Sequence, residues 1–282
     1  MSEFQHYYFR TIDKPLSAAQ RKEVENLSSH IDVSANSAEV SYSYGSFKHD
    51  EEKVLEEYFD AMLYQTNWGQ KKLMFRFPNG SVDYKTMQAY RIDGSNYTGY
   101  ETVINIRQSV DYVLLVVEYC DDDFEGRVEE NALDSLLDLR AQLMSGDYSC
   151  LYSFWLKILS LKEEDDEEDF DDDEIGELPA LPFGLVKPSS ALKSFIEFYE
   201  IDEKLVSAAA SFTIKSTKQE PNYQTLVVDM NEADKTQWLL RLVKGETLLD
   251  VKLKKQLADT GSSDEGITVT FEQIMKKTLK IK

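Results

Sequence analysis

The densest group of side chains that could do chemistry is a run of carboxylates near the middle of the chain. Between residues 163 and 174, eleven of the twelve residues are acidic, and the exception is Phe170. Hard cations bind carboxylate oxygens, but they need several oxygens held in a fixed geometry. Like charges at this density repel one another and favour a solvated segment. We therefore expect either a solvated linker or a site for a basic partner. The acidic residues are Glu163, Glu164, Asp165, Asp166, Glu167, Glu168, Asp169, Asp171, Asp172, Asp173 and Glu174.

Aromatic residues form a second candidate group in the N-terminal third of the chain. Tyrosine and tryptophan anchor protein interfaces because they give a large contact area with few rotatable bonds, although they also fill ordinary cores. A surface that stacks nucleic-acid bases needs basic residues beside the rings, and only Lys48, Lys71 and Lys72 lie nearby in the sequence. Core packing and an interface or ligand groove both stay open. The candidate interface residues are Tyr42, Tyr44, Phe47 and Trp68.

Patterns for metals, cofactors and nucleophiles are weak. Acids from Asp121 to Glu129 follow part of the spacing of a calcium loop, but Ala132 stands where a bidentate Glu is needed. Cys120, Cys150 and the three histidines show no zinc-ligand spacing. Glycine-rich phosphate loops and the GxSxG nucleophile pattern are also missing from the sequence. We therefore expect no cofactor and assign no catalytic residue.

The charge of the chain limits the classes of partner. The 282 residues carry a net charge of −21, and residues 121–174 alone hold 20 acids and 4 bases. Residues 235–282 hold 6 acids and 10 bases, so the two blocks could also pair with each other. A negative field repels nucleic-acid phosphates and anionic membranes and attracts basic partners. Two cysteines and an N-terminus without a basic stretch before an apolar run favour a cytoplasmic protein.

The hydrophobic pattern predicts mixed α and β structure. Residues 111–120 are almost continuously apolar and suit a central strand buried on both faces, which implies helices packed over a sheet. Glu118 within that strand is expected to be paired, because a buried carboxylate without a partner is costly. Further strands are predicted at 6–13, 39–44, 72–77, 86–92, 100–107 and 224–229. Residues 267–282 fit either a strand or a short helix.

Helices are predicted from apolar residues at three- and four-residue spacing and from their caps. The helix that begins at Asp50 carries Val54, Leu55, Phe59 and Met62, and Gly69 is expected to end it. A helical region is expected from 129 to 161, with Gly146 between two helices. Other helices are predicted at 17–30, 189–199, 202–211 and 231–244.

Several strings in the N-terminal third are distinctive: HYYFRTIDKPL (6–16), YSYGSFKHD (42–50) and EYFDAMLYQTNWG (57–69). Through them, and through SFIEFYEID (194–202), the chain resembles a family of uncharacterised bacterial cytoplasmic proteins. This chain has Tyr44-Gly45-Ser46 where the family tends to show Trp-Gly-Asp, so a role of that Trp or Asp does not transfer. The resemblance implies no known activity. It implies companion proteins with SWIM-type zinc fingers. A metal-bearing partner is therefore expected as an alternative to a basic partner.

Together these patterns predict an α+β fold with a mixed or antiparallel N-terminal sheet, a helical middle, and a smaller C-terminal part that is α+β or helical. The predicted boundaries are 1–125 for an α+β domain, 126–162 for a helical segment, 163–188 for an acidic and proline-containing linker, and 189–282 for a C-terminal domain. We expect a non-enzymatic adaptor that binds a basic or metal-bearing protein. The alternatives are a metal-dependent hydrolase or nuclease using Asp and Glu and, less favoured, a nucleic-acid mimic.

Overall fold

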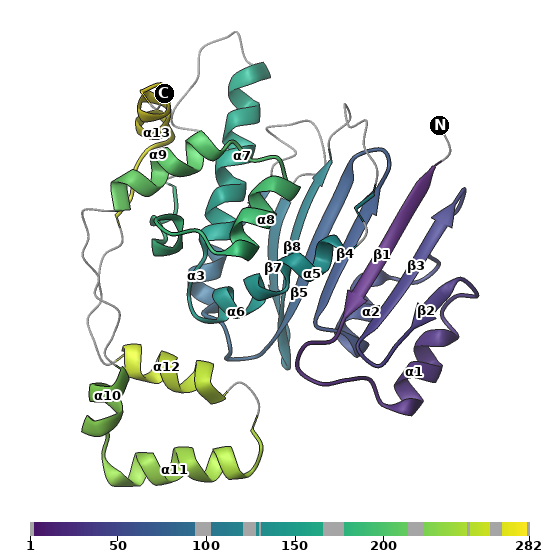
Figure 1. Cartoon of the computed structure of the whole chain (residues 1–282), viewed down its shortest axis with the longest axis horizontal. Helices are drawn as coiled ribbons and strands as arrows, with labels where there is room; N and C mark the ends of the chain where they lie inside the picture. Colours follow the sequence, from purple (N-terminus) through teal and green to yellow (C-terminus); the bar gives the residue numbers. More distant parts are fainter. Residues whose placement is uncertain are drawn as a thin grey trace.

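The computed structural model describes residues 3–93, 103–120, 128–129, 131–165, 178–213, 223–246, 249–259 and 267–280. Its centre is an eight-stranded sheet in the order β2-β3-β1-β4-β5-β8-β7-β6, in which every neighbouring pair is antiparallel (Figure 1). The predicted α+β class with an antiparallel sheet is confirmed. The strands are β1 (Phe4–Arg10), β2 (Ile31–Val33), β3 (Ser37–Ser43), β4 (Ala61–Thr66), β5 (Gln70–Pro78), β6 (Ile92–Asp93), β7 (Val103–Gln108) and β8 (Tyr112–Cys120).

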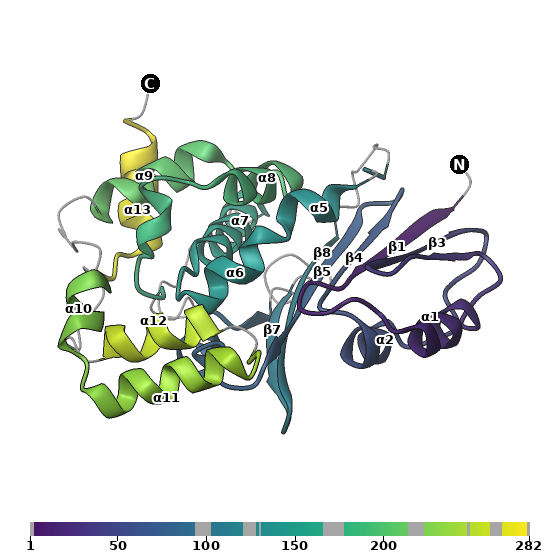
Figure 2. The same cartoon turned by 60° about the horizontal axis from the view of Figure 1, so that its bottom comes forward.

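Strand β8 is the central strand that its apolar sequence predicts. It pairs with β5 on one side and β7 on the other, and its residues from Val113 to Tyr119 are all buried. Successive side chains of a strand point to opposite faces, so a strand that is apolar at almost every position needs cover on both faces. Helices supply that cover on each side of the sheet (Figure 2).

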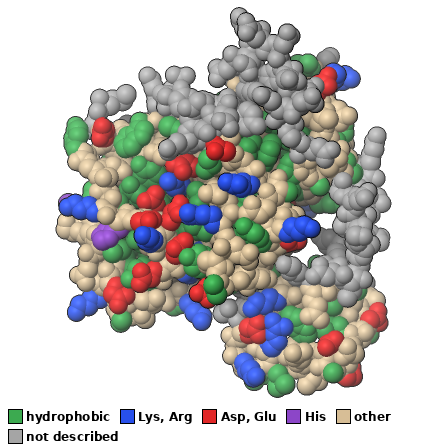
Figure 3. Space-filling model, turned by 180° about the vertical axis from the view of Figure 1, so that it is seen from behind, with side chains coloured by type: hydrophobic (Ala, Val, Ile, Leu, Met, Phe, Trp, Pro, Cys, Tyr) green, Lys and Arg blue, Asp and Glu red, His purple; other side chains and the backbone are tan. Residues whose placement is uncertain are grey.

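Helices α1 (Ala18–Glu25) and α2 (Glu51–Tyr58) pack on one face of the sheet, against a core that contains Phe9, Leu55 and Met74. Both begin at the expected caps. Ser17 forms a reciprocal capping box with Gln20, and the Asp50 carboxylate accepts hydrogen bonds from the first backbone N–H groups of α2. Figure 3 views the molecule from this side and shows acidic and basic side chains interspersed over it.

The opposite face of the sheet carries a larger helical layer. One hydrophobic core joins residues from Tyr8 in β1 to Ile274 near the C-terminus, and Tyr199 donates a hydrogen bond of 3.2 Å to the backbone oxygen of Val117 in β8. Gly146, at φ 86°, separates two helices as predicted. The elements of this layer are α3 (Tyr84–Gln88), α5 (Ala132–Leu136), α6 (Asp138–Met144), α7 (Ser149–Asp165), the 3-10 turn η1 (Phe183–Leu185), α8 (Ser190–Phe198), α9 (Glu203–Thr213) and α13 (Phe271–Thr278).

Helices α10 (Tyr223–Asp229), α11 (Glu232–Val243) and α12 (Leu249–Asp259) form a separate three-helix group (Figure 1). Its buried side chains are few: Trp238 and Leu257 in the described part. The Arg241 guanidinium lies 3.9 Å from the centre of the Trp238 ring. Asn231 caps α11 and Gly245, at φ 70°, follows its end, as predicted. Among the described residues, the elements after residue 189 are all helical.

Three predicted elements are wrong. The helix beginning at Asp50 ends at Tyr58, and residues 61–66 form β4 instead. All six residues of β4 are buried between two strands, and such a doubly buried strand has the same continuous apolar pattern as a helix extension. Residues 84–88 form α3 after an Asp83 cap, where a strand from 86 was predicted. The predicted strand 224–229 is α10, because β-branched residues without a neighbouring strand gain nothing from a strand conformation.

In the parts of the chain that the structure describes, no helix combines the length and apolarity needed to cross a membrane.

Candidate functional site

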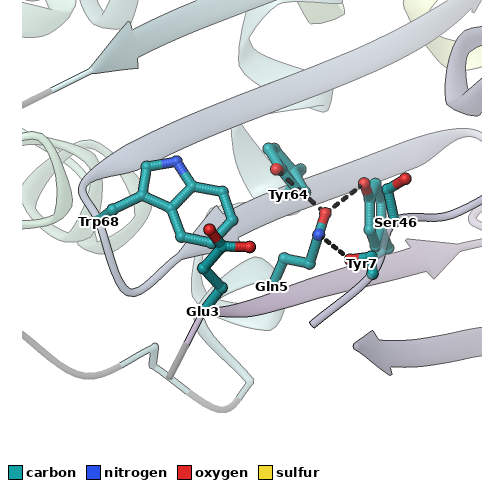
Figure 4. A pocket seen from close by; sticks show the side chains of 7 residues that line it. Glu3, Gln5, Tyr7, Ser46, Tyr64 and Trp68 are labelled. Carbon is teal, nitrogen blue, oxygen red and sulfur yellow. Dashed lines mark hydrogen bonds between the residues drawn. The ribbon is translucent and has the colours of Figure 1, made fainter. Parts of the chain in front are cut away.

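A pocket of about 660 Å³ opens at the end of the sheet where β1 begins (Figure 4). Its volume lies within the range of ligand-binding pockets, which is about 300–1,000 Å³. Residues from β1, the loop after β3, β4 and the β4–β5 turn contribute to it. We call it the Gly45 pocket, and its lining residues are Glu3, Gln5, Tyr7, Gly45, Ser46, Tyr64 and Trp68.

The register of the sheet brings the floor of the Gly45 pocket together. Gln5 and Tyr7 are two residues apart in β1, so both side chains point to the same face. Tyr64 of β4 lies directly opposite Tyr7 in the antiparallel ladder, and the two ring centroids are 4.5 Å apart. The chain leaving β3 then passes beside these residues with Gly45 and Ser46.

Gln5 holds this floor in one arrangement. Its side-chain oxygen accepts hydrogen bonds from the hydroxyls of Tyr7 (2.9 Å) and Tyr64 (3.3 Å). Its side-chain nitrogen donates to the backbone oxygen of Gly45. Gln5 is only 7% exposed, so both ends of a buried amide are satisfied, and neither tyrosine hydroxyl can move away without breaking a hydrogen bond. The floor is therefore formed before any ligand arrives.

Both tyrosines keep their protons at neutral pH. Burial, followed by the negative charge of Glu51, raises the pKa of Tyr7. Burial, followed by the influence of neighbouring Tyr7, raises the pKa of Tyr64 well above its ordinary value. A general base works best when its pKa lies near the operating pH. These hydroxyls therefore serve as structural donors and aromatic walls, and neither is suited to remove a proton.

The rim of the pocket differs from its floor. Glu3 is exposed, and Trp68 is 37% exposed. Figure 4 shows these two side chains together on one side of the pocket, away from Ser46 and Tyr7. Glu3 is the one charged residue among the described lining residues. Within the described part of the chain, its carboxylate has no ion pair.

The loop over the pocket has two unusual residues. Tyr44 adopts a left-handed backbone conformation, with φ 62°, and its side chain is 74% exposed. Non-glycine residues adopt this conformation at a cost of about 1–2 kcal/mol. Gly45, in contrast, lies in open space, because a Cβ added there would approach only the Tyr42 ring, at 4.0 Å. A larger side chain at this lining residue would therefore be accommodated without displacing backbone.

A buried ion cluster lies behind the tyrosines. The Lys72 ammonium is 3.2 Å from the Glu118 carboxylate and 3.3 Å from the Glu51 carboxylate, and Gln70 donates to Glu118 at 2.8 Å. Burial opposes the charged form of Lys72, but Glu118 and Glu51 outweigh it and raise the pKa of this lysine. The prediction that Glu118 is paired is confirmed. The cluster carries two negative charges and one positive charge.

The four predicted interface aromatics lie in different environments. Trp68 lines the Gly45 pocket, and Tyr44 is exposed in the loop beside it. Tyr42 is half-buried, and its hydroxyl donates to Ser28 at 2.8 Å. Phe47 is buried in the core under α1 and α2. The structure therefore brings one of the four into a pocket and one to the surface beside it.

The side chains of the predicted acidic run, 163–174, lie outside the described residues, although the backbone of α7 extends to Asp165. Most of the calcium-like loop, at 121–127 and 130, also lies outside them. Cys120 ends strand β8 and Cys150 is buried in α7, and neither forms a disulfide. Among the residues that the structure describes, no group of three or more His, Cys, Asp or Glu side chains could hold a metal ion.

Sequence reasoning missed Glu3, Gln5, Tyr7, Gly45 and Ser46 as site residues. One signal was present: Glu3, Gln5 and Tyr7 alternate along a strand and share one face. That spacing does not reveal which residue of another strand lies opposite.

Comparison of the chain with protein-family models, curated proteins and solved structures found no match.

Proposed function

We propose that this chain is a non-enzymatic interaction protein that binds a protein partner through positive charge on that partner, carried by basic side chains or by a bound metal. The observation that carries the proposal is the concentration of negative charge. The chain has a net charge of −21, and residues 121–174 contain 20 acids against 4 bases. Such a field raises the rate of encounter with a basic surface and disfavours acidic partners.

The Gly45 pocket supports binding more than reaction. Its two tyrosine hydroxyls both donate to Gln5, and the pKa of each is raised. Its one charged lining residue in the described chain, Glu3, stands on an exposed rim beside Trp68. Aromatic walls and a carboxylate are features of a surface that recognises a basic segment. We place this activity in the cytoplasm, which agrees with two cysteines that form no disulfide.

A direct test uses the full-length protein and a fluorescent dodecapeptide of Lys, Arg and Gly, with a Glu and Gly peptide of the same length as control. Fluorescence anisotropy measures binding at about 0.01 M and about 1 M salt, between which the Debye length falls from about 30 Å to about 3 Å. We expect the basic peptide alone to bind, and at least tenfold more weakly in high salt.

The matched variant replaces the eleven acids of 163–174 with Asn and Gln and keeps the length of the chain. We expect it to bind the basic peptide at least tenfold more weakly than the wild type, with an unchanged circular dichroism spectrum. Equal binding by the two proteins would refute the role of the acidic run. Absence of binding to the basic peptide in low salt would refute the proposed function.

A further inference from the structure

We infer that the Gly45 pocket receives one arginine side chain of the basic partner, with its guanidinium group against Trp68 and paired with Glu3. The inference rests on the proposed function and adds the place and the chemistry of recognition. The pocket has seven lining residues in the described chain, which come from four separate segments.

The first argument is the combination of chemical groups. A cation placed over the face of an aromatic ring is attracted by the ring electrons, most strongly by tryptophan. Glu3 and Trp68 stand together on one side of the pocket (Figure 4). A guanidinium is planar and weakly hydrated, so it can stack on a ring and still form a two-pronged pair with a carboxylate. An ammonium group cannot make both contacts equally well.

The second argument is the charge around the pocket. Lys72 acts electrostatically on Tyr7 of the pocket wall, and its ammonium group already lies between Glu51 and Glu118, at 3.3 Å and 3.2 Å. That cluster has one uncompensated negative charge. Glu3 adds another at the rim and has no ion pair within the described residues. An anionic ligand would meet repulsion from both, whereas a cation would be attracted by both.

The third argument is that the pocket is preformed. Gln5 fixes both tyrosines and the Gly45 carbonyl through three hydrogen bonds. A fixed floor lowers the entropy that binding must overcome. The volume of about 660 Å³ leaves room for residues that flank the arginine. The exposed, left-handed Tyr44 next to Gly45 fits a loop whose conformation is set by contacts with a partner.

The experiment compares two tripeptides that differ only in charge: Gly-Arg-Gly and Gly-citrulline-Gly. Citrulline has the shape of arginine but carries no charge. Nuclear magnetic resonance of the full-length protein follows the indole N–H of Trp68, which is assigned by its loss in Trp68→Phe. We expect Gly-Arg-Gly to shift this signal in a saturable way, and the citrulline peptide to bind at least fivefold more weakly.

Three variants locate the binding. Gly45→Leu places a large side chain at a residue that lines the pocket and should abolish the shift. Ser43→Leu is the matched control, because it adds a leucine at an exposed position of β3 outside the pocket lining, and it should bind like the wild type. Glu3→Gln keeps the shape of an exposed side chain and should weaken binding at least threefold. If Gly45→Leu fails to fold, the Glu3→Gln result decides.

Equal binding of the two tripeptides, or unchanged binding by both Gly45→Leu and Glu3→Gln, would overturn the inference. The two proposals fail separately. If the basic dodecapeptide binds through the acidic run and ignores Gly45→Leu, the proposed function stands and the arginine pocket is rejected. If Gly-Arg-Gly binds in the pocket but the basic dodecapeptide does not bind in low salt, the arginine pocket stands and the proposed function is rejected.

Discussion

Strand β1 runs between two carboxylates that differ in burial and in their partners. At the end of β1, Asp60 is 2% exposed and accepts hydrogen bonds from the backbone N–H groups of Ile12 (2.7 Å) and Asp13 (2.9 Å) and from Arg76 (2.9 Å). At the start of β1, Glu3 stands at an open rim without an ion pair in the described chain. The Asp60 carboxylate is therefore occupied by contacts within the protein, whereas the Glu3 carboxylate is accessible to a ligand.

Arg140 completes the closed end. It is 2% exposed, it donates to both carboxylate oxygens of Asp13 at 2.9 Å and 2.8 Å, and its Nε donates to the backbone oxygen of Arg76 at 2.8 Å. Since Arg140 belongs to α6, this network joins the helical layer to the sheet and to the turn after β1. The difference between the two ends of β1 distinguishes acids that stabilise the fold, such as Asp60, from acids that can bind a ligand, such as Glu3.

The largest effect is expected from breaking the closed end. Arg140→Ala leaves Asp13 without its cationic partner, although Arg76 still pairs with Asp60, and removing one member of a buried pair costs about 3–5 kcal/mol. We expect the free energy of unfolding in urea to fall by that amount. Arg21→Ala, at an exposed arginine of α1, should change it by less than about 0.5 kcal/mol. If Arg140→Ala lowers the free energy of unfolding by less than about 1 kcal/mol, the buried ion pairs at the end of β1 do not stabilise the fold as proposed.

Gly184 and Gly45 allow a second comparison between a closely packed region and an open one. A Cβ added at Gly184 in η1 would overlap the Asp147 carboxylate and the Ser149 hydroxyl, whereas one at Gly45 meets open space. Overpacking of this kind costs about 1–3 kcal/mol. We expect thermal unfolding to show that loss for Gly184→Ala and almost none for Gly45→Ala. Similar midpoints for the two variants would contradict the difference in free space around the two glycines.

The smallest effect concerns acid pH. Burial opposes ionisation of Asp60, but the backbone N–H groups of Asp13 and Ile12, with Arg76 and Arg140, outweigh it and lower its pKa. A carboxyl whose pKa is lower in the folded state stabilises the protein above its unfolded value of about 3.9, and this contribution disappears as the pH falls further. The slope from one group is at most about 1.4 kcal/mol per pH unit.

We therefore expect the free energy of unfolding of the wild type to decline more steeply below about pH 4 than that of Asp60→Asn. Urea unfolding at several acid pH values measures both. Parallel curves for the wild type and Asp60→Asn would show that the Asp60 network does not govern acid stability.

The sequence predicted elements well wherever a local signal decides the conformation. Ser17, Asp50 and Asn231 cap helices as expected, and of the two candidates Ser189 and Ser190 the cap is Ser189. Caps are predictable because capping depends on neighbouring residues alone. The apolar run of β8 was sufficient to predict a central strand with helices on both faces. Strand β4 was mistaken for helix because its type depends on the two strands that flank it, and those lie elsewhere in the sequence.

The candidate site was less predictable for the same reason. Trp68 was proposed from its residue type, and it does line the pocket. Gln5 gave no signal, because its importance comes from three hydrogen bonds whose partners lie in β1, β4 and the loop after β3. Only the sheet register places Tyr64 opposite Tyr7. Chemistry assembled from several segments cannot be inferred from spacing along one of them.

The core that covers the helical side of the sheet has a consequence for how the protein is made. It includes Tyr8 of β1 and also Phe271 and Ile274 of α13, which packs on α9. A chain emerging from the ribosome would therefore display the apolar face of its strands until the helices that cover it, up to α8, had also been synthesised. Contacts between such distant residues slow folding and prolong the exposure of apolar surface. Newly made chains should depend on chaperones more than a protein whose strands and covering helices are adjacent in sequence.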